Sequence, residues 1–157
     1  MLHTRLVALM LAATTLAASG CGGVTKSSTP TAQATQSQQG NAEFIRQADA
    51  ICARLNAQVA PIHDTNFATV APRLATLEQA ALADLAKLTP PASIAGDWKQ
   101  IVTSQQTIAE DTVKLGQYGK ANNLNGARTL FFTIDDVQKQ MIATAHRDGF
   151  RDCSHST

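Results

Sequence analysis

The segment "NAEFIRQADAICARLNAQVA", residues 41–60, decides the fold class, because its apolar residues recur with the period of an α-helix. Steps of four, three, four and four residues separate the members of one stripe, Phe44, Ala48, Ile51, Leu55 and Val59. Residues at this spacing lie on one face of a helix. We therefore expect a helix from about Asn41, whose side chain can cap its first turn, to Ala60, where Pro61 prevents continuation.

Three more segments carry the same helical period. We expect helices over about 69–88, over about 94–118, and from residue 124 or 127 to 148. Thr69 is an N-cap residue type, and a helix starting there would place Pro72 in its first turn, where a missing N–H costs little. Gly149 is a suitable stop for the last helix, with Phe150 placed for the hydrophobic contact of such a cap.

The predicted elements define the fold class. No segment after residue 40 alternates apolar and polar residues over the length of a strand. Four helices of similar length joined by short loops are typical of a bundle whose neighbours run in opposite directions. The sequence thus predicts an all-α fold, an antiparallel up-down-up-down four-helix bundle over residues 41–157.

The N-terminal residues have the features of a targeting segment. A basic start, an apolar run of about a dozen residues and small residues at its end predict a secretory signal peptide over residues 1–20. The run is too short for a transmembrane helix, which needs about 20 residues. The stretch "ASGC", residues 18–21, resembles the lipobox of bacterial lipoproteins.

The lipobox resemblance implies that Cys21 becomes the mature N-terminus and carries acyl chains such as palmitate. Two or more chains hold a protein stably on a membrane. The expected location is therefore the extracytoplasmic face of a cell membrane, with the lipid as the contact to it. The alternative is an ordinary secreted protein with a free Cys21.

Residues 21–40 are expected to form a flexible linker after the lipidated cysteine. They consist mainly of Ser, Thr, Gln, Gly and Ala, and such a composition buries too little apolar surface to offset chain entropy. The expected domain organisation is a signal peptide over 1–20, the linker over 21–40 and one helical domain over 41–157.

The remaining cysteines, Cys52 and Cys153, predict a disulfide, because an even pair in an exported protein is usually oxidised. Cys52 lies on the first expected helix, and the tail after Gly149 can fold back to reach it. The alternative is redox chemistry, which usually shows a C-x-x-C motif or a thiol at a helix N-terminus. We interpret the bond as structural.

Three stretches carry a resemblance to a protein family. They are "ADAICARLN" (48–56), "LTPPA" (88–92) before a Trp-bearing helix, and "AHRDGFRDC" (145–153). They resemble a group of small exported actinobacterial proteins and lipoproteins of unknown function. The resemblance implies a helical bundle pinned by a disulfide, and it supplies no catalytic residue.

The charge balance limits the possible partners. Removing the signal peptide takes away Arg5 and leaves Lys+Arg and Asp+Glu equal, at 12 each. A neutral chain without a basic stripe is not expected to bind nucleic acid. An envelope protein is the partner class that a membrane-tethered bundle would suit.

Motifs that would indicate catalysis or a metal are absent from the sequence. None of the G-x-S-x-G, H-E-x-x-H, P-loop or dinucleotide-binding patterns occurs. The spacing of histidines and carboxylates also lacks the tight pattern of zinc sites, and we interpret these side chains as solvated: His63, Asp64, Asp135, Asp136, His146, Asp148, Asp152 and His155. We therefore expect no catalytic residue, no cofactor and no metal.

A binding groove is the one site that the sequence suggests. The third expected helix carries two polar residues, Gln105 and Thr112, within its apolar stripe. Together with Trp98 and Tyr118 they define a possible groove between the helices, although a lone Trp on such a stripe is more often part of the core. The expected function is a non-catalytic binding or scaffolding module. The alternative is a carrier of a small molecule or lipid held between the helices, and an enzyme is less expected.

Overall fold

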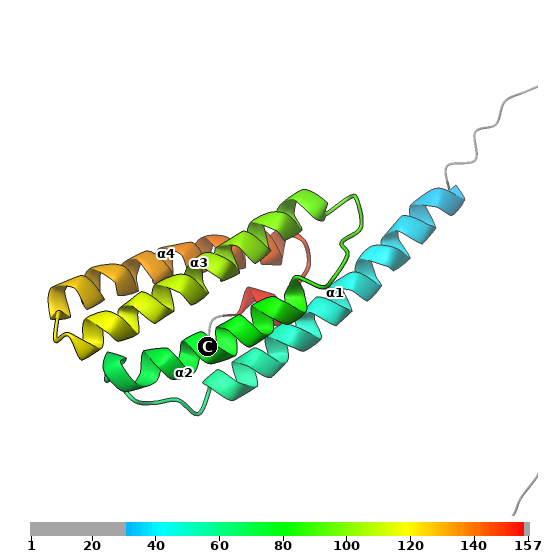
Figure 1. The fold of residues 1–157 in the computed structure, drawn as a ribbon. Coiled ribbons are helices and arrows are strands. Elements are labelled where there is room, and N and C mark those ends of the chain that lie inside the picture. The colour runs from blue at the N-terminus through cyan, green and yellow to red at the C-terminus, as the bar shows by residue number, and fades with distance from the viewer. Residues whose placement is uncertain (1–30, 156–157) are drawn as a thin grey trace, which may run out of the picture.

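A computed structural model describes residues 31–155, with side chains from residue 38 onward. Within this range the chain forms four α-helices and a short 3-10 turn (Figure 1). Their bounds are α1 Thr31–Val59, α2 Phe67–Leu85, α3 Ala95–Lys120, α4 Leu124–Arg147 and η1 Asp152–Ser154. The predicted signal peptide and Cys21 lie outside the described residues.

The four helices run alternately up and down, as predicted. The α1–α2 and α3–α4 connections lie at one end of the molecule, and the α2–α3 connection lies at the other (Figure 1). The closest packing is between α2 and α3 and between α3 and α4, with α1 held mainly against α2. By contrast, α1 and α4 barely approach each other, and η1 contacts both of them. The bundle is therefore open along one side, where the C-terminal turn bridges the gap.

The first helix begins earlier than expected, at Thr31 instead of Asn41, and its N-terminal part projects past the other helices (Figure 1). Residues 31–40 contain Ala and Gln and no proline, and extending a helix is much less costly than nucleating one. These residues thus continue α1, whereas the predicted linker extended to residue 40. Asn41 is not a cap, and its side-chain oxygen accepts a hydrogen bond of 2.9 Å from Ser93 Oγ.

The start of α2 also differs from the prediction, because Asn66 and not Thr69 is the N-cap. The Asn66 side chain accepts a hydrogen bond of 2.9 Å from the backbone N–H of Ala68. Thr69 lies inside the helix, and its hydroxyl donates to Asp64 at 2.5 Å. Consequently Pro72 lies in the second turn.

An aromatic cluster forms the core at the end of the bundle where α4 terminates. The ring centroid of Phe44 lies 4.8 Å from that of Trp98, and Trp98 and Phe150 stack at 5.8 Å. Phe150 reaches this position because Gly149, with φ of 88°, reverses the chain after α4. The Phe150 N–H bonds to the Ala145 carbonyl at 3.0 Å, as in the glycine cap that the sequence predicted.

Candidate functional site

A cavity of about 400 Å³ lies inside the bundle. All four helices and the C-terminal turn contribute to its wall, and its size is typical of small-molecule sites. The apolar part of the lining includes Leu55, Val59, Leu74, Ile108, Ile134 and Met141. The cavity extends along the side on which α1 and α4 do not close against each other.

The predicted groove residues divide between this cavity and other places. Gln105 and Thr112 both line the cavity and are otherwise buried. Trp98 lies in the aromatic core, only 5% exposed, and Tyr118 is exposed near the end of α3. The structure therefore brings two of the four residues together at one site and places the other two outside it.

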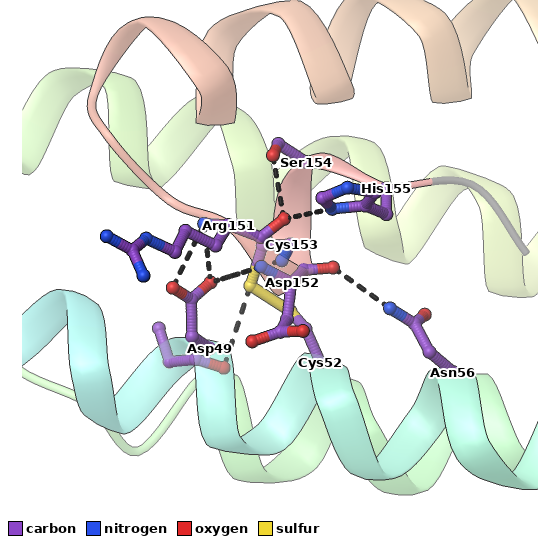
Figure 2. The surroundings of a disulfide bond; sticks show 9 residues. Asp49, Cys52, Asn56, Arg151, Asp152, Cys153, Ser154 and His155 are labelled. Carbon is purple, nitrogen blue, oxygen red and sulfur yellow. Dashed lines mark hydrogen bonds between the residues drawn. A yellow bond between two sulfur atoms is a disulfide. The ribbon is translucent and has the colours of Figure 1, made fainter.

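The C-terminal turn forms one wall of the cavity, and the predicted disulfide attaches this turn to α1. Cys52 and Cys153 are bonded, with their Cα atoms 5.1 Å apart, and both line the cavity. Asp49, one turn before Cys52, accepts hydrogen bonds from the backbone N–H groups of Arg151, Asp152 and Cys153 at 3.0–3.2 Å (Figure 2). The turn is thus fixed by one covalent bond and by one buried carboxylate.

Two further contacts involve the same turn. The Asn56 side-chain amide donates to the Asp152 carbonyl at 3.0 Å, and the His155 ring nitrogen Nδ1 contacts the Arg151 carbonyl (Figure 2). Asn56, Asp152 and His155 all line the cavity. Some of their polar atoms therefore already form hydrogen bonds within the cavity wall.

Glu78 is the charged residue of the cavity lining whose hydrogen-bonding capacity is least used. It projects from α2 into the cavity wall, and its Oε2 atom is shielded from solvent without a hydrogen-bond partner among the described residues. Burial raises the pKa of Glu78, and a hydrogen bond from Thr112 acts in the opposite direction. A buried carboxyl oxygen without a donor costs free energy, and such groups are typical of functional sites.

Sequence analysis missed Glu78, although a signal was present. It lies four residues after Leu74 and three before Ala81, so it falls within the apolar stripe of its own helix. The same reasoning had identified Gln105 and Thr112 on α3. The same search for polar residues within an apolar stripe, applied to the second helix, would have identified Glu78, which faces Thr112.

One aromatic side chain lines the cavity, and two others adjoin it. Phe131 lines it and is nevertheless 46% exposed, and its ring lies 6.0 Å from that of Phe67. The adjacent Phe132 is exposed and lies under the Arg128 guanidinium, 5.9 Å from the ring centroid. Apolar surface that this chain leaves exposed therefore adjoins the cavity.

The histidines and carboxylates that we interpreted as solvated mostly lie at the surface, but Asp135 and Asp148 are half-buried. Asp148 is half-buried at the end of α4, and its Oδ2 has no partner among the described residues. Burial and the neighbouring Asp97 raise the pKa of Asp148. Across residues 31–155, no three His, Cys, Asp or Glu side chains are placed to hold a metal ion.

Comparisons with known proteins give no relative of this chain. No protein-family model, no curated protein and no solved structure matches it. None of the helices in the described part of the chain is sufficiently long and apolar to cross a bilayer.

Proposed function

We propose that this chain is a membrane-anchored envelope lipoprotein whose helical domain binds a small, largely apolar molecule without catalysis. The observation that carries the proposal is the cavity of about 400 Å³ between the four helices. Sites for small ligands are commonly concave, mainly apolar and lined by a few polar groups, and this lining has that composition. Gln105, Thr112 and Glu78 supply polar groups to the wall.

The anchor in this proposal is the lipid on Cys21. Its support is the lipobox-like stretch "ASGC" after a short apolar run. Intact mass of membrane-extracted protein tests it, with a Cys21→Ser variant as the control. The expected mass begins at Cys21 and includes acyl chains, and an unlipidated free thiol at Cys21 would overturn this part of the proposal.

The binding function is tested by filling the cavity with a larger side chain. Leu74 and Leu82 are both half-buried leucines of α2, but only Leu74 lines the cavity. We expect the neutral dye Nile red to bind the purified full chain at one site with increased fluorescence. Leu74→Trp should abolish this binding, and Leu82→Trp should leave it unchanged.

Two outcomes would overturn the binding function. One is an absence of saturable dye binding by the unmodified chain. The other is equal binding by both tryptophan variants, which would place the dye on the exposed surface. Circular dichroism of each variant establishes that the helices are retained.

Scaffolding of an envelope protein is the second candidate function, and the exposed aromatic residues favour it. Phe131, Phe132 and Leu124 are 46%, 52% and 73% exposed on α4. Exposed apolar clusters commonly mark interaction surfaces. A Phe132→Ser variant should then lose a cross-linked envelope partner and still bind Nile red, whereas an unchanged cross-linking pattern would exclude this surface.

A further inference from the structure

We infer that the cavity selects a small amphiphilic amine, a ligand with an apolar body and one cationic nitrogen that pairs with Glu78. This inference rests on the proposed binding function and specifies the ligand class for the same cavity. It follows from the sign and the pairing of the charged groups on the wall.

The charged side chains of the lining are predominantly acidic. Glu78, Asp135 and Asp152 contribute carboxyl groups, and among the described residues that line the cavity none is Lys or Arg. His155 is the one further titratable side chain of the lining, and its Nδ1 contacts the Arg151 carbonyl. An anionic ligand would therefore enter a site whose fixed charges repel it.

The three carboxyl groups differ in the groups that already neutralise or solvate their charge. Asp135 pairs with Lys139 at 2.5 Å on the same helix. Asp152 is exposed, so water solvates it. Glu78 has only Thr112 beside it, and its Oε2 is buried without a donor. The group that gains most from a ligand donor is thus Glu78.

The chemistry of Glu78 favours an ammonium group over a neutral donor. A carboxylate only accepts hydrogen bonds, so a ligand must bring the donor. A hydrogen bond between two ionised groups is roughly twice as strong as a neutral one, and it strengthens where water is excluded. The apolar residues around Glu78, including Leu74 and Ile108, would contact the rest of the ligand.

The test compares three ligands with the same chain length and different head groups, which are octylamine, octanol and octanoate. Isothermal titration calorimetry on the purified full chain measures their affinities at neutral pH. We expect octylamine to bind roughly tenfold more tightly than octanol, a difference of about 1.4 kcal/mol, because a hydrogen bond between two charged groups is stronger than a neutral one. Octanoate should bind more weakly than octanol.

Matched variants assign the preference to Glu78. Glu78→Gln keeps the shape and removes the charge, so it should bring octylamine to the affinity of octanol. Glu110→Gln removes a carboxylate from the exposed face of α3 and should retain the preference. The comparison of ligands in the unmodified chain is decisive even where a variant folds poorly.

The outcomes distinguish this inference from the proposed function. If octanol and octanoate bind as tightly as octylamine, the cavity binds apolar ligands and the inference is wrong. If the preference for octylamine survives in Glu78→Gln, the nitrogen lies elsewhere and the inference is also wrong. If neither these ligands nor Nile red bind, the binding function itself is wrong.

Discussion

Asp49 shows how much of this fold depends on one polar side chain. Its buried carboxylate accepts hydrogen bonds from three consecutive backbone N–H groups, those of residues 151–153, in the C-terminal turn. Those donors would otherwise lose water on folding without gaining a partner. The carboxylate also lies one helical turn from Cys52, so it fixes the position of the disulfide partner.

We predict that Asp49→Asn destabilises the protein by about 1–3 kcal/mol, because the amide loses the charge and presents donors to other donors. Urea unfolding measures the change in the free energy of unfolding. Asp136→Asn, on the exposed face of α4, is the control and should be neutral. Equal unfolding midpoints for the two variants would contradict the role assigned to Asp49.

A second prediction at this scale concerns Glu78 and pH. Burial raises the pKa of Glu78 above its ordinary 4.5, so the folded chain binds this proton more tightly than the unfolded chain. Its contribution to stability is therefore present below pH 4.5 and is lost as pH rises through the raised value. The other titratable side chains of the cavity lining are Asp135, Asp152 and His155, and a Glu78→Gln variant leaves them unchanged.

Glu78→Gln should accordingly raise the melting temperature at pH 7, and the gain should shrink as pH falls through the raised pKa of Glu78 towards 4.5. Thermal melts of both proteins across this range provide the measurement. A variant that is less stable at pH 7 would show that the ionised carboxyl is already compensated in the folded chain.

Sequence patterns predicted the roles of residues that follow simple counting or helix-end rules. They did not predict the roles of residues whose partners lie far along the chain. The cysteine pair follows from counting, and Gly149 with Phe150 follows from the known pattern of helix ends. Asp49 and Glu78 lie beside or within apolar stripes, and helical periodicity assigns no role to a polar residue there. The partners of Asp49 lie about 100 residues away, and no local pattern relates a helix carboxylate to such a turn.

At the scale of the elements, the contact between α2 and α3 depends on glycine. A Cβ at Gly119 would lie 2.5 Å from the Ala68 backbone nitrogen, and one at Gly116 would lie 3.2 Å from Pro72 Cδ. Both glycines lie on the face of α3 that packs against the start of α2. They allow the two backbones to approach closely where Pro72 adds bulk.

Gly119→Ala should therefore destabilise the protein by about 1–3 kcal/mol, the usual range for overpacking. Gly96 lies on the same helix with nothing within 4 Å of an added Cβ. Gly96→Ala is thus the matched control and should be neutral or stabilising, because alanine favours helix. Thermal unfolding of both variants decides the matter, and similar melting temperatures would argue against the close approach.

The ends of the helices were harder to predict than their existence. The apolar stripes define four helices, but α1 extends to Thr31 because residues 31–40 contain no proline and lengthening an existing helix costs little. The start of α2 was predicted at Thr69, but the N-cap is Asn66. Several polar residues lie near this start, and each of them can cap a helix. A choice among such residues depends on loop contacts, here those of Asp64, which the sequence pattern does not contain.

At the scale of the whole molecule, the disulfide compensates for the missing contact between α1 and α4. It links residues that are 101 positions apart, so it removes much conformational freedom from the unfolded chain. The up-down topology was predictable from four helices and short loops. The open side was not, because it depends on how the C-terminal turn lies between two helices.

Replacing both Cys52 and Cys153 by Ala should cost about 2–4 kcal/mol of stability, the typical value for a native disulfide. Urea unfolding of the double variant and of the oxidised wild type measures the loss. Reduction of the wild type should produce a similar change. An unaltered free energy of unfolding would show that Asp49 and the core suffice to hold the turn.

The position of residues 150–154 has a consequence if the chain is exported across a membrane, as we propose. Phe150 belongs to the aromatic core, and η1 lies between α1 and α4. A translocation channel releases the N-terminal part first, so α1 to α3 would emerge while these partners are still enclosed. The native bundle could then assemble only after residues 150–154 have emerged. In a chain stalled before Phe150, Cys52 should react with thiol reagents, and after release it should not.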